Sequence, residues 1–187
     1  MAGPGIILLQ WMGEAPMDGG VLERIRGQVE AVFDIPVRLR MADDPPGDSL
    51  DPRRRQHSST KILRWILASG LPAGVKVLGV TDVDLFIPVL TFVFGEAQLG
   101  GPAAVVSVAR LRRTYDDQPA LEVTMEGRLL KECLHELGHT FGLAHCADGA
   151  CVMSRSNTVL DVDRKHAAFC RDCRLRLRTL TEEVEGA

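Results

Sequence analysis

The sequence lacks the long apolar run that a membrane span requires. No stretch reaches about 18 apolar residues, so we expect no membrane partner. The short apolar run at residues 6–12 is not preceded by a basic residue, because the first one in the chain is Arg24. This arrangement is not typical of a signal peptide. We therefore expect a cytoplasmic protein.

A strong charge of either sign is also missing. The net charge of the 187 residues is −3, and so weak a field does not favour a polyanionic partner such as nucleic acid. Two local basic runs, at residues 53–55 and 174–178, are expected to be solvated surfaces. The 45% hydrophobic and 25% charged fractions are ordinary for a globular protein. We expect one domain that acts as a monomer.

The pattern of apolar residues alternates between that of strands and that of helices. It predicts strands at residues 5–12, 37–41, 75–80, 92–98 and 103–109, and helices at 20–33, 59–68, 119–141 and 162–180. Such alternation implies a mostly parallel sheet with crossover helices. The composition shifts at Gly142, from apolar elements to cysteines and polar loops. We therefore predict a single domain, 1–187, with an upper lobe, 1–142, and a lower lobe, 143–187.

The motif HELGHTFGLAH, which begins at His135, indicates a metal site. His135 and His139 are four residues apart on a helix, so both imidazoles face one ion. Gly142 permits the helix to end, and the returning chain supplies His145 as a third ligand. Glu136 is not needed as a ligand and is the candidate general base. The pattern predicts a zinc site with an open fourth position, suited to hydrolysis. The alternative is an amphipathic helix whose histidines bind no metal.

All five cysteines lie in the last third of the sequence. Cys146 and Cys151 form one close pair, and Cys170 and Cys173 form another. Two such pairs predict a tetrahedral tetrathiolate zinc site, which leaves no open position and is therefore structural. Cys133 points to another helix face and is expected in the core. A redox Cys-x-x-Cys and plain buried cysteines are the alternatives, although neither explains two pairs.

With Met153 added, the histidine motif resembles the metzincin clan of zinc peptidases. In that clan a methionine-containing turn underlies the metal, and Met153 matches it. Arg155 stands where some metzincins carry a tyrosine ligand, so none is implied here. The full order of histidines, methionine and cysteines is similar to the archaemetzincin family. The loop between Met153 and Cys170 is one residue shorter than in the family pattern, a difference that a loop absorbs.

The resemblance implies an α/β (α+β) fold. A twisted, mostly parallel five-stranded sheet with backing and active-site helices would lie above a small C-terminal lobe held by zinc. We expect two Zn²⁺ ions per chain, one catalytic and one structural. The resemblance also implies aminopeptidase-like or oligopeptidase-like hydrolysis of peptides or small proteins, with no defined natural substrate. In metzincins the strand before the last sheet strand rims the cleft, so residues 92–98 are expected to bind extended substrate.

The sequence leaves two other functions open. The first is a zinc-binding protein of this fold without meaningful peptidase activity. The second is a nucleic-acid-binding zinc module that uses the four cysteines and the basic residues 174–178. The net charge argues against the second function, which would also leave Glu136 without a role.

Overall fold

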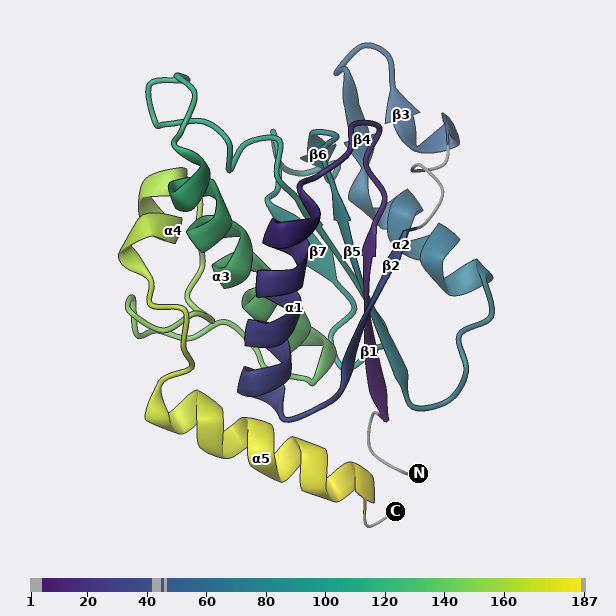
Figure 1. The fold of residues 1–187 in the computed structure, drawn as a ribbon, viewed down its shortest axis with the longest axis vertical. Helices are drawn as coiled ribbons and strands as arrows, with labels where there is room; N and C mark the ends of the chain where they lie inside the picture. The colour runs from purple at the N-terminus through teal and green to yellow at the C-terminus, as the bar shows by residue number, and fades with distance from the viewer. Residues whose placement is uncertain (1–4, 42–44, 46, 186–187) are drawn as a thin grey trace.

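The computed structural model describes residues 5–41, 45 and 47–185, and its centre is a five-stranded sheet (Figure 1). The strand order is β2-β1-β5-β8-β7. The strands are β1 (Ile6–Trp11), β2 (Val37–Met41), β5 (Val75–Thr81), β7 (Gly95–Ala97) and β8 (Ala103–Ser107). β1 pairs in parallel with β2 and β5, β5 pairs in parallel with β8, and β7 runs antiparallel to β8. The predicted mostly parallel five-stranded sheet is confirmed.

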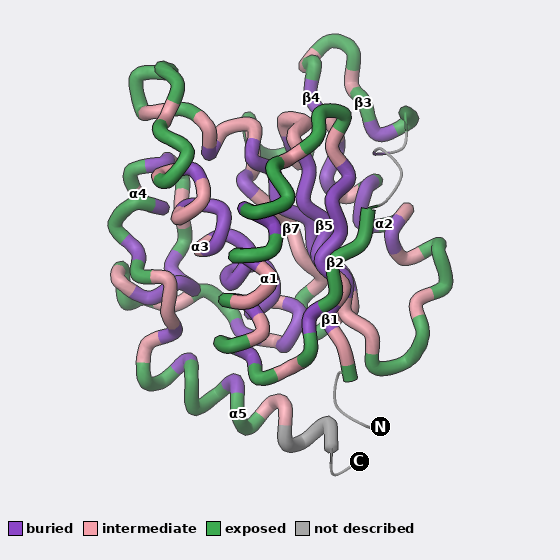
Figure 2. The backbone as a smooth tube through the Cα atoms, in the orientation of Figure 1, coloured by how far each residue is buried: buried purple, intermediate pink, exposed green. Residues whose placement is uncertain are grey.

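Helices cover both faces of this sheet (Figure 1). α1 (Gly19–Phe33) and α3 (Glu122–Thr140) lie on one face, and α2 (Ser59–Ala68) lies on the other. α2 begins where Ser58 accepts a hydrogen bond from the amide of Lys61, which caps the first turn. Each helix buries an apolar face in one of two core clusters, one on each side of the sheet. The buried strands between them appear as the purple centre of Figure 2.

The structure corrects two predicted helices. The helix expected at 119–141 begins at Glu122, because its first amides bond to the carbonyl of Leu121 and Pro119 instead pairs with Arg113 in an isolated bridge. The single helix expected at 162–180 was wrong. It is two helices, α4 (Val159–Arg164) and α5 (Arg171–Glu185), separated by an extended, buried Lys165. Cys170 therefore precedes α5 instead of lying within it.

A second, three-stranded sheet was not predicted. Its order is β3-β4-β6, with β3 (Leu50–Asp51), β4 (Gln56–Ser58) and β6 (Leu85–Phe86), and a short 3-10 helix, η1 (Gly47–Ser49), precedes it. Strands of two or three residues are too short to show periodicity. β3 and η1 fall in the segment 42–52, whose Asp, Pro and Gly content predicts a loop. Residues 42–44 and 46 of that segment lie outside the described residues.

The chain after Gly142 joins the core beneath α1 and α3. Phe33 of α1 stacks on Phe141 with ring centroids 5.0 Å apart and meets Phe169 edge-on at 5.7 Å. These rings connect the end of α3 to the segment before α5. α5 lies along the lower side of the molecule and is largely exposed (Figure 2). The division into lobes 1–142 and 143–187 stays a prediction. Within the described residues, every helix is too short or too polar to cross a membrane.

Candidate metal centres

Three histidines that the sequence singles out converge at the end of α3. His135 and His139 lie one turn apart on the helix, and the chain leaves it through Gly142, whose φ of 97° is in the left-handed region. This turn brings His145 back, so that one ring nitrogen from each histidine lies within 4.8 Å of the others. Nε2 of His135 and Nε2 of His139 are 3.1 Å apart. Two imidazole ligands of a tetrahedral zinc ion would be separated by about 3.3 Å.

Backbone carbonyls set the orientation of two of these rings. Nδ1 of His135 donates to the carbonyl of Val152 at 2.8 Å, and Nδ1 of His139 donates to the carbonyl of Leu143 at 2.7 Å. Because a carbonyl only accepts, each Nδ1 carries the proton and each Nε2 keeps a free lone pair. This is the hydrogen bonding that metal-binding histidines use. The donor set of the described residues therefore fits zinc.

Loss of solvation favours the neutral form of the same histidines, most strongly for the buried His135. It is the main cause that lowers the pKa of His135 well below its usual value, and it also lowers the pKa of His139 and His145. The positive charge of Lys165 acts in the same direction on all three rings. A metal ion binds imidazole only in its neutral form. The site therefore disfavours the protonated histidines that would compete with a metal.

Glu136 lies on α3 beside the first of these histidines and faces the edge strand β7. Burial, followed by the nearby negative charge of Glu132, raises the pKa of Glu136 well above its usual value. Gly95 of β7 makes this position possible, because a Cβ there would lie 2.7 Å from both Cγ and Oε1 of Glu136. A carboxylate with a raised pKa binds a proton more readily, which suits a general base.

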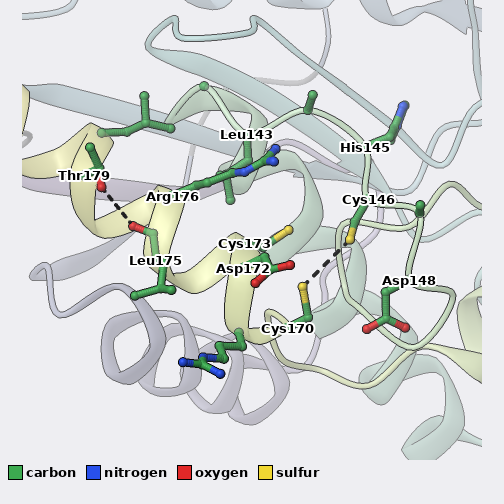
Figure 3. A pocket seen from close by; sticks show the side chains of 15 residues that line it. Leu143, His145, Cys146, Asp148, Cys170, Asp172, Cys173, Leu175, Arg176 and Thr179 are labelled. Atoms are coloured by element: carbon green, nitrogen blue, oxygen red, sulfur yellow. Dashed lines mark hydrogen bonds between the residues drawn. The ribbon is translucent and has the colours of Figure 1, made fainter.

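The four paired cysteines form a second cluster. Their sulfur atoms lie within 4.8 Å of one another, and Sγ of Cys146 is 3.8 Å from Sγ of Cys170. Ligands of a tetrahedral tetrathiolate zinc site are also separated by about 3.8 Å. Cys146, Cys170 and Cys173 line a pocket of about 1000 Å³ that His145 lines too (Figure 3). Cys133 is buried outside both clusters, and burial raises the pKa of its thiol.

Comparison with known proteins identifies the family. Residues 70–179 match the model of peptidase family M54. The chain is 41% identical to the archaemetzincin of Archaeoglobus fulgidus over 157 residues, which cover 84% of this chain and 91% of that protein. This chain belongs to the archaemetzincin family. It is therefore a zinc metallopeptidase.

Solved structures agree with this assignment. The crystal structure of the archaemetzincin of Methanopyrus kandleri matches 95% of this chain and 95% of its own, with a TM-score of 0.82 and 36% identity. A structure described as a zinc-dependent peptidase from Methanocorpusculum labreanum matches 91% of this chain and 99% of its own, with a TM-score of 0.80 and 30% identity. Both likenesses extend over nearly the whole chain.

In this member of the archaemetzincin family, Met153 lies beneath the histidine helix. It is fully buried, and a Cβ built at Gly138 would overlap its sulfur. Met153 was predicted from the sequence, whereas the roles of Gly138 and Gly95 were not. Gly138 stands between the two helical histidines, and a glycine inside a helix is a signal of close packing. The role of Gly95 depends on strand register and had no local signal.

We expect Gly138→Ala to destabilise the folded protein by about 1–3 kcal/mol, because the added methyl group would displace Met153. The shift of α3 should also lower the zinc content. Gly127→Ala is the matched control, since it lies on the same helix with nothing within 4 Å of its added Cβ. Urea denaturation and metal analysis measure both effects. Equal stability of the two variants would contradict the close packing of Gly138 on Met153.

Proposed function

We propose that His135, His139 and His145 hold a catalytic zinc ion and that Glu136 is the general base of peptide hydrolysis. The strongest support is the convergence of three neutral imidazoles, two of which have their Nδ1 atoms tied to carbonyls. Zinc bound by these residues would supply Lewis acidity, which lowers the pKa of water to near 7 and polarises the scissile carbonyl. We also propose a second, structural zinc ion held by Cys146, Cys151, Cys170 and Cys173.

Glu136 would move the proton in this reaction. Its carboxylate accepts a proton from the attacking water and later gives it to the nitrogen of the leaving amine. Its place beside β7 supports this role, because a substrate on that strand would lie against the carboxyl group. The raised pKa of Glu136 helps it to take the first proton.

The edge strand β7 is the proposed binding surface for substrate. Within the described residues, β7 is the last strand of the five-stranded sheet and pairs with β8 alone in it. An exposed edge offers backbone amides and carbonyls to an extended peptide. Glu96 does not compete for this edge, because its carboxylate accepts hydrogen bonds from Ser59 and Thr60 at the start of α2.

N-methylation of a cleaved peptide tests this placement. Methyl groups on alternate amides that face β7 should lower kcat/KM by about 2- to 10-fold per amide, because each methyl group removes one backbone hydrogen bond. The matched control carries the methyl groups on the intervening amides, which face away from the strand. A library of peptides with the zinc-loaded enzyme provides the parent substrate. Equal loss at both sets of positions would argue against binding along β7.

A monomeric state and the absence of nucleic-acid binding stay predictions. Sedimentation of the zinc-loaded protein should give the mass of one chain. Titration with nucleic acid at low salt should show no binding, because the net charge is −3. Tight binding with a steep salt dependence would restore the alternative of a nucleic-acid-binding module.

A further inference from the structure

A buried ion pair lies directly behind the histidine site. Nζ of Lys165 is 3.0 Å from Oε1 of Glu132, and the two side chains are 0% and 3% exposed. Glu132 lies on α3 one turn before His135, and Lys165 follows α4. Placing both charges out of water is costly, and a well-packed apolar pair often stabilises a fold equally well. Stability alone is therefore a weak explanation for this pair.

Lys165 has a second contact that reaches a proposed metal ligand. Its Nζ donates to the carbonyl of Val152 at 3.4 Å, and the same carbonyl accepts the Nδ1 hydrogen of His135 at 2.8 Å. A carbonyl oxygen has two lone pairs and can serve both donors. The amide of Val152 in turn donates to the carbonyl of Ala168 at 3.0 Å. The Val152 backbone is thus held at both of its polar atoms.

We propose that Lys165, held in place by Glu132, is a positioning residue for the catalytic metal. It fixes the carbonyl of Val152, and this carbonyl fixes the ring orientation and tautomer of His135. The inference rests on the proposed function, in which His135 is a zinc ligand. Partners that orient metal-bound histidines typically contribute 10- to 100-fold to metal affinity. Within the described residues, Lys165 donates hydrogen bonds to Glu132 and to the Val152 carbonyl but to none of the proposed ligands, so it acts through one shared backbone oxygen.

A neighbouring ion pair offers a matched control. Arg128, also on α3, forms a two-pronged pair with Asp163 of α4 at 2.7 Å and is 5% exposed. Its Nη1 donates to the carbonyls of Leu111 and Arg113. Neither carbonyl bonds a histidine of the site. This pair joins α3 to α4 just before Lys165, and neither of its partners bonds a proposed metal ligand.

The decisive experiment compares two double variants. Lys165→Met with Glu132→Gln removes both charges at similar volume. Of the two side-chain donors to the Val152 carbonyl in the described part of the chain, His135 then remains. We expect this variant to fold and to bind zinc at the histidine site about 10- to 100-fold more weakly than the parent, measured by competition with a chelator. Arg128→Met with Asp163→Asn should lower the stability and keep the zinc affinity.

A second measurement needs no zinc. In the metal-free protein, the Nδ1 hydrogen of His135 should exchange with solvent faster in the Lys165 variant than in the parent or the Arg128 variant, as followed by NMR. Glu132→Asp is a milder variant, which retracts the carboxylate and should weaken zinc binding in the same direction. Unchanged zinc affinity in the folded variants, or equal loss in the control, would overturn the proposal. Failure of the parent itself to bind zinc at the histidines would instead refute the proposed function.

Discussion

Glu136→Gln should lower kcat/KM for peptide hydrolysis by about 10²- to 10⁴-fold and leave the zinc content unchanged. Glutamine has nearly the same shape as glutamate, so it fits the space that Gly95 leaves beside β7. An amide cannot accept the proton of the attacking water, so the base is lost while the three histidines remain. The rate is measured with a peptide that the parent cleaves, and zinc is measured per chain.

The control for this variant is Glu126→Gln. Glu126 lies on the same helix but pairs with the exposed Arg24 at the surface, and such ion pairs contribute little to the stability of the fold. Its activity should match that of the parent. Parent-like hydrolysis by the Glu136 variant would show that Glu136 is not the base. Loss of zinc from the Glu136 variant would show instead that the carboxylate takes part in metal binding.

The same substitution has a consequence for stability in the metal-free protein. The pKa of Glu136 is raised by burial, so the folded state holds the carboxyl proton more tightly than the unfolded state does. The stability that Glu136 contributes is therefore present below its usual pKa and is lost as the pH rises through the raised value. Glutamine does not titrate. Urea denaturation across this pH range should show a smaller fall in stability for Glu136→Gln than for the parent.

Long periodic segments made most of the fold predictable. The helix predicted at 59–68 is α2 with the same bounds, because its apolar spacing and its Ser58 cap agree. The break between α4 and α5 was missed because it depends on Lys165. Lysine is rarely buried, and nothing near it in the sequence shows that Glu132 will neutralise it. The small sheet β3-β4-β6 was missed because its strands depend on long-range pairing.

Site residues that lie close together in the sequence could be predicted, whereas those that are brought together by distant parts of the chain could not. The histidines and cysteines follow fixed spacings, so one helix and one turn suggest their grouping. The contact of Gly95 with Glu136 depends on how β7 pairs with β8, and the shared carbonyl of Val152 depends on how the lower segment folds back under α3. The contacts that orient the site therefore could not be predicted from the sequence, whereas the proposed ligands could.

We expect the cysteine cluster to strengthen zinc binding at the histidine site. The reason is that two of its cysteines are each next in sequence to a residue that builds the histidine site. His145 is followed directly by Cys146, so a metal ion on the sulfur fixes the backbone that delivers the imidazole. Cys151 is followed directly by Val152, whose carbonyl orients His135. Thiolate ligation of structural zinc contributes on the order of 10 kcal/mol to folding. Its loss should therefore loosen two of the three histidines at once.

Replacement of Cys170 or Cys173 by serine should accordingly remove the structural ion and also weaken zinc binding at the histidines. Cys133→Ser is the control, since this buried thiol lies outside both clusters and should cost stability without loss of metal. Acid should release the structural zinc in the parent, because only deprotonated cysteines bind it. The measurement is zinc per chain at saturating zinc, with peptide hydrolysis alongside, and we expect two ions in the parent. Full metal content in Cys173→Ser, or loss of an ion in Cys133→Ser, would refute the coupling between the two sites.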